Sequence, residues 1–260
     1  WLSSRGLGDV YKRQVLDDQM AAIRDLNRNL EFRKAIKHAI DGKAFAKAMS
    51  KGPFVTVYAG GLARDSAFFD ADATSFFPYN PAGANSILDG LGLIDTDGNG
   101  IRNLPNGGGD LVINLVQNKG SDNEMLIGDG MATMMAEVGI KINIKPMEDT
   151  EPTRQAGEWD WLLVRSQQEM AFPNSGYWSD MGPVTTSSFD PHLGTDEHPQ
   201  QLQPFEKEIV SILEEWRDGV EGAEAQALMS RYQKLFTENV YMPGIVQYLS
   251  LIHISEPTRR

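Results

Sequence analysis

The segment DTDGNGIRNLPNGGG (residues 95–109) has the residue types and the spacing of the start of a calcium-binding loop. An EF-hand loop needs oxygen ligands at positions 1, 3 and 5, a glycine at position 6 and a bidentate Glu at position 12. Asp95, Asp97 and Asn99 supply the three oxygens and a glycine follows, but Asn106 stands at position 12. The missing carboxylate favours a turn between a helix and a strand, in which Asp, Asn and Gly supply the geometry. A calcium-binding module stays an alternative.

A second group of potential metal ligands lies in the segment FDPHLGTDEHP. It gathers Asp190, His192, Asp196, Glu197 and His198, which are ligand types suited to a transition metal. A loop rich in Pro and Gly gives no fixed ligand geometry, so we expect neither a metal nor another cofactor here. No Ser, His and acid arrangement stands out either. We therefore expect a protein that is not an enzyme, with a metal-dependent hydrolase as an alternative.

The residues most suited to binding a solute follow the apolar segment WDWLLV. Five polar residues come in succession, and two aromatic residues that could stack on a solute follow eight positions later. Aromatic rings supply contact area with few rotatable bonds. The predicted ligand-binding residues are Arg165, Ser166, Gln167, Gln168, Glu169, Tyr177 and Trp178.

A βαβ unit is predicted over residues 110–147. DLVINLVQ (residues 110–117) and IKINIKPM (residues 140–147) have strand patterns, and the helix between them opens with Ser121 and Glu124 as a capping box. Such a unit requires parallel pairing of its two strands. The methionines of the helix, at helical spacing, are expected to fill the core.

The segment WDWLLVRSQQE (residues 159–169) is predicted to hold a further strand of this sheet. Leu162 to Val164 run without alternation, as in a strand covered on both faces, so we expect a central strand. In parallel α/β sheets ligands meet the carboxyl ends of the strands. This places the polar residues that follow Val164 at the expected binding edge.

The remaining segments predict helices, a loop and a last strand. NLEFRKAIKHAIDGKAFAKAMSK indicates two short helices, with Asp41 capping the second. NPAGANSILDGLG indicates a helix with Asn80 as N-cap and Gly92 past its end. Residues 52–79 show no sustained period and are expected to form an ordered loop. Two amphipathic helices and the strand MPGIVQY complete the chain.

The composition excludes several classes of protein. The 260 residues carry a formal net charge of −12 with no basic stripe, which argues against nucleic acid as a partner. The absence of cysteine excludes disulfides and thiolate zinc sites. No apolar run reaches the roughly 18 residues of a membrane-spanning helix. A hydrophobic fraction of 41% is that of an ordinary globular chain.

Both ends of the sequence are expected to be foreign to the protein. SRGLGDVYKRQ and LSLIHISEPTR can be written as translations of opposite strands of one oligonucleotide, a transposon adapter used for sequencing libraries. We therefore expect residues 1–14 and 249–260 to be adapter-derived and residues 15–248 to be the natural segment.

The order of motifs resembles the bacterial extracellular solute-binding proteins of ABC transporters, the family of the dipeptide and oligopeptide receptors. The segments that carry the resemblance are FRKAIKHAID, NPAGANSILDGLGLIDTDGNGI, MMAEVGIKINIKPME, WDWLLVRSQQEMAFP and RYQKLFTENVYMPGIVQY. They cover nearly all of residues 28–248 and stand in the order of the family. The same Asp-Gly turn occurs in the family without being a ligand site.

The resemblance implies a fold, a function and partners. The fold is a periplasmic-binding-protein-like α/β lobe with a mixed, βαβ-containing sheet flanked by helices, and residues 15–248 would be the second, C-terminal lobe of two. A peptide or similar small solute would be held between this lobe and the N-terminal lobe, which this chain lacks. The protein would lie in the periplasm or outside the cell, at the membrane, and pass its solute to an ABC permease. A ligand-sensing domain of a transcriptional regulator is the alternative.

The family pattern also bears on the ligand. A strand Asp is followed in the family by Trp six residues later, by Asp nine later and by Pro thirteen later. Counting from Asp160 gives Ser166, Glu169 and Pro173. Glu169 keeps an acid that could pair with a cationic group, whereas Ser166 departs from the pattern. That departure puts a peptide ligand in doubt.

Overall fold

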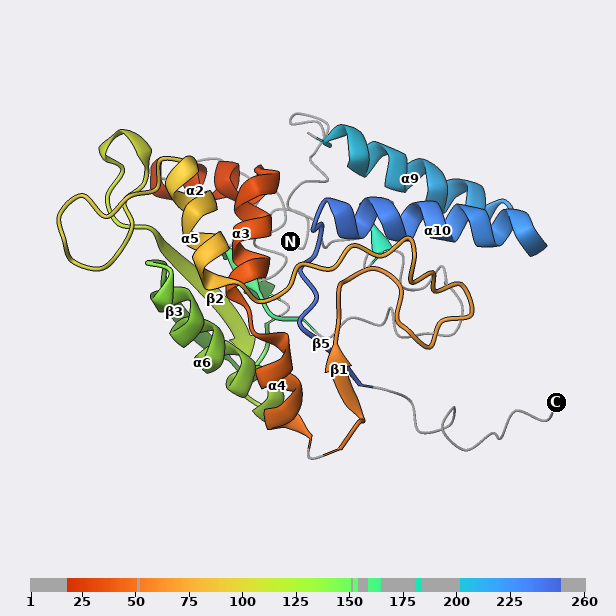
Figure 1. The fold of residues 1–260 in the computed structure, drawn as a ribbon, viewed down its shortest axis with the longest axis horizontal. Helices are drawn as coiled ribbons and strands as arrows, with labels where there is room; N and C mark the ends of the chain where they lie inside the picture. The colour runs from red at the N-terminus through yellow and green to blue at the C-terminus, as the bar shows by residue number, and fades with distance from the viewer. Residues whose placement is uncertain are drawn as a thin grey trace, which may run out of the picture. The chain divides into compact units, whose positions relative to one another are not determined.

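The computed structural model describes residues 18–50, 52–150, 152–153, 159–164, 181–183 and 202–248 (Figure 1). The chain divides into two compact units. Unit 1 comprises residues up to Ile40 together with Pro78–Val164, and unit 2 comprises Asp41–Phe77 together with the residues from Arg165 onward. The two terminal segments predicted to be adapter-derived lie outside the described residues.

Unit 1 is built on a parallel sheet of three strands in the order β3-β2-β4. The strands are β2 (Val112–Asn118), β3 (Lys141–Met147) and β4 (Trp161–Leu162), and the helix α6 (Asp122–Glu137) connects the first two. The predicted βαβ unit is thereby confirmed, with Val112 opposite Lys141 and Leu115 opposite Trp161. The prediction of a central strand after Trp159 is wrong for the described residues, because β2 lies in the middle and β4 pairs on one side only. An apolar run shows burial and not position within a sheet.

Further helices of unit 1 are α2 (Asp18–Arg28), α3 (Leu30–Ala39) and α5 (Pro81–Gly90). The Asn80 side chain accepts the Gly83 backbone N–H at 3.0 Å, which confirms the predicted N-cap of α5. Helix α2 was not predicted. It follows the terminal segment directly, and its sequence is strongly polar. A short 3-10 turn, η1 (Pro105–Gly107), lies in the loop before β2.

The start of α6 differs in one bond from the predicted capping box. Ser121 Oγ accepts the Glu124 backbone N–H at 3.3 Å, as predicted. The Glu124 carboxylate, however, accepts the backbone N–H of Asn118 at 2.8 Å. The acid thus ties the first turn of the helix to the last residue of β2, which fixes the geometry of the carboxyl end of that strand.

The core of unit 1 lies between the sheet and the helices. Phe32, Leu88, Leu111, Ile113, Leu115, Met135 and Ile140 are almost completely buried. Of the four methionines of α6, Met131 and Met135 are buried, which confirms for these two that they fill the core, whereas Met125 and Met134 are only partly buried.

In the part that the structure describes, unit 2 combines a two-stranded antiparallel ribbon with the helices α4, α9 and α10. Its elements are α4 (Gly42–Met49), β1 (Val55–Val57), α9 (Pro204–Arg217), α10 (Gly222–Glu238) and β5 (Val246–Tyr248). Asp41 caps α4 by accepting the Lys43 and Ala44 backbone N–H groups, each at 3.0 Å, as predicted. The expectation that residues 52–79 lack regular structure is wrong for β1, which pairs with β5. That pairing depends on residues about 190 positions away and leaves no local signal.

The helices α9 and α10 form an antiparallel pair over a second core. Phe205 stacks edge-on against Tyr241 at 5.8 Å, and Arg231 bonds Glu208 at 2.6 Å, so the start of one helix lies by the end of the other. The buried core contains Ile209, Leu213, Met229, Tyr232 and Phe236.

A buried glutamine of α10 fastens the loop that follows β1. Gln233 is fully buried; its Oε1 accepts the Leu62 backbone N–H at 2.5 Å, and its Nε2 donates to the Gly60 carbonyl at 3.2 Å. Gly61 has φ +74°, and a Cβ there would lie 2.5 Å from Gln233 Oε1. The loop therefore needs glycine at this position for both conformation and space.

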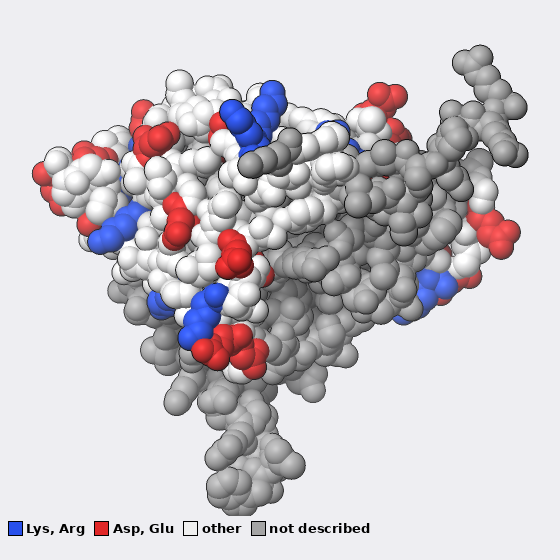
Figure 2. Space-filling model, turned by 90° about the horizontal axis from the view of Figure 1, so that it is seen from below, with Lys and Arg blue, Asp and Glu red and all other residues white. Residues whose placement is uncertain are grey.

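The described surface mixes charges of both signs. On the face in Figure 2, acidic and basic side chains alternate, and its described residues form no continuous basic stripe. Among the helices that the structure describes, none has both the length and the apolar composition needed to span a bilayer.

Candidate functional site

The carboxyl ends of β2, β3 and β4 meet at one edge of the parallel sheet of unit 1. Parallel α/β sheets bind their ligands at this edge, because loop side chains and backbone groups converge there. The described residues at the edge are Asn118, Lys119, Met147, Glu148, Leu163 and Val164. The sequence prediction had placed the binding residues directly after the last of them.

An exposed ion pair marks this edge. Lys119 Nζ lies 2.6 Å from Glu148 Oε1, and the two side chains are 48% and 80% exposed. At that exposure the pair is solvated and contributes at most about 1 kcal/mol. The Lys119 backbone N–H also donates to the Met147 carbonyl at 2.9 Å. The residues that follow β2 and β3 are thus in contact, and their charged ends are accessible to a ligand or a partner.

The chain leaves β4 at the same edge. The Leu163 backbone N–H donates to the Val116 carbonyl at 3.0 Å, which continues the pairing with β2 by one residue. Val164 is 47% exposed. It is the last described residue before the predicted ligand-binding set.

The predicted ligand-binding residues themselves lie outside the described residues. This holds for Arg165, Ser166, Gln167, Gln168, Glu169, Tyr177 and Trp178, and equally for the metal alternative from Asp190 to His198. Their roles stay predictions. What the structure adds is the position of the sheet edge from which they follow.

Four side chains that sequence reasoning missed hold β4 in place. Asp160 Oδ2 accepts both the backbone N–H and the side-chain Nδ2–H of Asn114, each at 2.8 Å. Trp161 Nε1 donates to Asn27 Oδ1 at 2.9 Å, and Asn27 Nδ2 donates to the Asp160 carbonyl at 3.3 Å. No spacing in the sequence connects residue 27 to residue 160. Only the fold brings them together.

The loop from Asp95 to Asn99 uses its acceptors to shape a turn. Asp95 Oδ1 accepts the Gly98 backbone N–H at 2.8 Å, and Asp95 Oδ2 accepts that of Gly100 at 2.9 Å. These bonds, that from Gly100 foremost, hold the pKa of the exposed Asp95 carboxyl below its usual value. The Asp, Asn and Gly residues therefore supply turn geometry, as the sequence favoured.

Two further acids and amides close this loop onto the start of β2. Asn99 Nδ2 donates to Asp97 and to both carboxylate oxygens of Asp110, each at 3.2 Å, and Asn103 Nδ2 donates to Asp110 Oδ1 at 3.1 Å. Within the described residues, no three His, Asp or Glu side chains are grouped so that they could hold a metal ion.

A groove of about 310 Å³ lies beside this loop, at the amino end of β3. It is lined by Asn85, Asp89, Ile94, Asp95, Gly100, Arg102, Ala136, Glu137, Val138 and Gly139. The groove thus lies at the sheet edge opposite the predicted binding edge.

Arg102 organises the groove and was also missed by sequence reasoning. Its side chain, 10% exposed, donates from Nε to the Val138 carbonyl at 2.7 Å and from its terminal nitrogens to Asp89 at 2.6 Å, to Asn85 at 2.7 Å and to the Leu93 carbonyl. Since every donor named here bonds a group of the protein, Arg102 ties together α5, the end of α6 and the loop.

One buried lysine lies outside both regions. Lys37 on α3 is 5% exposed, and desolvation lowers the pKa of its ammonium group to about 8. Burial away from water penalises the charged form. The next residue of α3, His38, is partly exposed. Its Nδ1 forms a 2.7 Å hydrogen bond with the Pro78 carbonyl.

The fold and the sequence together identify the family. A family model described as "Bacterial extracellular solute-binding proteins, family 5 Middle" matches residues 14–188. The chain belongs to the bacterial extracellular solute-binding proteins of family 5.

Individual relatives are similar over nearly the whole chain. The "Periplasmic alpha-galactoside-binding protein" of Rhizobium meliloti (strain 1021) is 32% identical over 261 residues, which cover 98% of this chain and 36% of that protein. The structure of the periplasmic binding protein MelB from Agrobacterium fabrum C58 in complex with stachyose is 32% identical, with a TM-score of 0.83 over 90% of this chain and 35% of that one.

A more distant structure shares the fold alone. The oligopeptide-binding protein AppA from Bacillus subtilis, in complex with a nonapeptide, has a TM-score of 0.68 at 16% identity, over 86% of this chain and 42% of that one. The chain spans about a third of the length of the α-galactoside-binding protein and of MelB. The alignment to the α-galactoside-binding protein covers 98% of this chain and therefore includes part of the two terminal segments. The adapter origin of those segments stays a prediction.

Proposed function

We propose that this chain is the second lobe of a receptor that binds a small solute outside the cytoplasmic membrane and passes it to an ABC permease. The observation that carries the proposal is the 32% identity, over 98% of the chain, to a periplasmic α-galactoside-binding protein. The parallel sheet supports it, because the predicted binding residues follow the carboxyl end of β4. The remaining lobe would come from the part of the receptor that this chain does not span.

The solute class that we propose is a neutral α-galactoside oligosaccharide, with a peptide as the competing ligand. A sugar offers hydroxyl groups as donors and acceptors, and Arg165, Gln167, Gln168 and Glu169 supply matching groups. The apolar face of a sugar ring needs a flat partner, which Trp178 supplies. Affinity would come from enclosing the ligand between lobes, without any bond being made or broken.

A thermal-shift experiment on the full-length gene product tests the proposal. Stachyose at 100 times its dissociation constant should stabilise the folded protein by about 2.7 kcal/mol, because it binds the folded form alone. The same concentration of a nonapeptide should leave the melting temperature unchanged. A shift with the nonapeptide and none with stachyose would replace the sugar by a peptide, and no shift with either would reject a receptor for these solutes.

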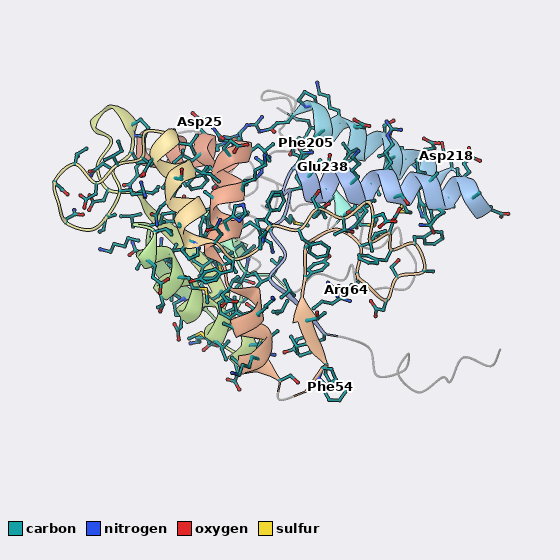
Figure 3. The ribbon with its side chains drawn as sticks, in the orientation of Figure 1. Asp25, Phe54, Arg64, Phe205, Asp218 and Glu238 are labelled. Atoms are coloured by element: carbon teal, nitrogen blue, oxygen red, sulfur yellow. The ribbon has the colours of Figure 1, made fainter. Side chains whose placement is uncertain are left out.

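A single substitution tests whether Glu169 belongs to the proposed ligand-binding residues. Glu169→Ala should abolish the stachyose-induced shift while leaving the melting temperature of the unliganded protein nearly unchanged. Glu238→Ala is the matched control. Glu238 is a half-exposed acid at the end of α10 (Figure 3), and its Oε1 lies 3.8 Å from Lys234 Nζ in a weak, solvated ion pair. A Glu169→Ala protein that keeps the full shift would remove Glu169 from the binding set.

A further inference from the structure

The strand β4 is too short to fix its own register. Its two residues pair with Leu115 and Val116 of β2, and the main chain adds one bond on each side, from the Asp160 N–H to the Asn114 carbonyl at 3.2 Å and from the Leu163 N–H to the Val116 carbonyl at 3.0 Å. A typical strand has five or six residues. A slip by one residue would turn every side chain of the strand to the opposite face. Something other than the ladder must exclude that slip.

The Asp160 carboxylate supplies the first constraint. Its Oδ2 accepts the backbone N–H of Asn114, a group of the central strand, and also the Asn114 side-chain amide, each at 2.8 Å. Both donors belong to one residue of β2. A carboxylate moved along the strand by one residue, about 3.3 Å, would face away from them.

Asn27 of α2 supplies the second constraint, from outside the sheet. Its Oδ1 accepts the indole N–H of Trp161 at 2.9 Å, and its Nδ2 donates to the Asp160 carbonyl at 3.3 Å. Its own carbonyl accepts a hydrogen bond from Arg33 at 3.0 Å, which holds the end of α2. A single amide thus contacts Asp160, the residue directly before β4, and Trp161, the first residue of β4. A one-residue slip would carry the indole to the other face of the sheet and break both bonds.

We propose that Asn27, Asn114 and Asp160 are positioning residues for solute binding: they set the register of β4, whose carboxyl end forms part of the sheet edge at which the solute would lie. The inference rests on the proposed function. It adds that affinity depends on a hydrogen-bond network located at the start of β4, away from the sheet edge at which the solute would lie.

The chain offers a matched control for Asn27. Asn85 of α5 is also half-buried in unit 1, and its side chain likewise accepts one hydrogen bond and donates one. Its Oδ1 accepts from Arg102 at 2.7 Å, and its Nδ2 donates to the Pro81 carbonyl at 3.0 Å. It lies at the groove by the amino end of β3. Asn27→Ala and Asn85→Ala should therefore destabilise the fold to a similar degree, whereas only the first should loosen β4.

The experiment combines calorimetric titration of the full-length protein with stachyose and hydrogen exchange at the Leu163 amide. Asn27→Ala should weaken stachyose binding at least tenfold, equivalent to about 1.4 kcal/mol, and speed exchange at Leu163. Asn85→Ala should stay within twofold of the wild type in both. Trp161→Phe keeps the ring packing and removes only the indole donor, so it should shift both readouts in the same direction by less.

Two other outcomes decide against the inference, and a third leaves the decision to the exchange measurement. Unchanged affinity and exchange in Asn27→Ala would show that the ladder alone sets the register. Equal losses in Asn27→Ala and Asn85→Ala would show a purely structural role. If the wild-type protein binds no stachyose, the proposed sugar-binding function fails, and exchange at the Leu163 amide alone tests whether Asn27 sets the register of β4. Faster exchange in Asn27→Ala but not in Asn85→Ala would keep that role for Asn27. Equal exchange rates in the two variants would reject it.

Discussion

Replacing Arg102 by methionine should destabilise unit 1 strongly, although Arg102 takes part in only one ion pair. Methionine keeps much of the length of the side chain but removes all its donors. The carbonyls of Val138 and Leu93, both in nearly fully buried residues, would then lose their hydrogen bonds to Arg102. Hydrogen bonds to a charged group contribute about 1.5–3 kcal/mol each, so the two together predict a loss of about 3–6 kcal/mol.

The ion pair itself should contribute little. Asp89 is 62% exposed, and solvent screens its attraction to the guanidinium group. Exposed pairs contribute about 0–1 kcal/mol. Asp89→Ala, which breaks only the pair, should therefore cost at most about 1 kcal/mol, whereas Arg102→Met should cost several times as much.

Urea unfolding of the two variants measures the difference. With a slope of about 3 kcal/mol per molar urea, the Arg102→Met midpoint should fall by about 1 M or more and that of Asp89→Ala by less than about 0.4 M. Exchange at the Leu111 amide, which donates to the Arg102 carbonyl at 2.6 Å, should rise in Arg102→Met and locate the loss in unit 1. Equal midpoints for the two variants would refute the argument, because they would show that the buried carbonyls contribute nothing.

Two further predictions concern unit 2 and pH. Gly61→Ala should lower the free energy of unfolding by at least about 1 kcal/mol more than Gly98→Ala, as judged by melting temperature. Both glycines have φ near +75°, so the backbone strain of an alanine is the same at the two positions. At Gly61, however, the new Cβ would also clash with Gln233 Oε1, at 2.5 Å. Equal effects would mean that Gln233 moves aside freely. For Lys37, the pKa of about 8 in the folded protein lies below the ordinary lysine pKa of 10.5, so the unfolded chain binds more protons between these two values. The free energy of unfolding should therefore rise with pH across that window, by about 3 kcal/mol in all. Lys37→Met should abolish this rise in a series of melting curves from pH 7 to 11, and a rise of equal size in the variant would assign it to other groups.

The sequence determined most of the helices and the βαβ unit. The two short helices joined at Asp41, the helix capped by Asn80 and the pair α9 and α10 all follow from a 3.6-residue apolar period and caps. These signals predict well because a cap contacts backbone groups only two or three residues away. The parallel pairing of β2 with β3 followed from the connecting helix alone.

The sheet edge at which we propose that the solute binds follows from the βαβ unit, but its side chains do not. A βαβ unit already implies that the carboxyl ends of its strands share one edge, and Lys119 and Glu148 do meet there at 2.6 Å. The side chains proposed to bind the solute stay predictions from their place after Val164.

The tertiary structure alone decided how distant segments are joined. Asn27 meets Trp161 across 134 residues, Gln233 meets Leu62 across 171, and the predicted last strand, β5, pairs with β1, which has no sustained strand pattern. A side-chain amide can bond almost any backbone group that comes within reach, so its partner cannot be read from its own neighbours. The sequence by itself therefore determined the local elements and the edge at which a solute would bind, whereas only folding brought together the polar side chains that hold those elements in position.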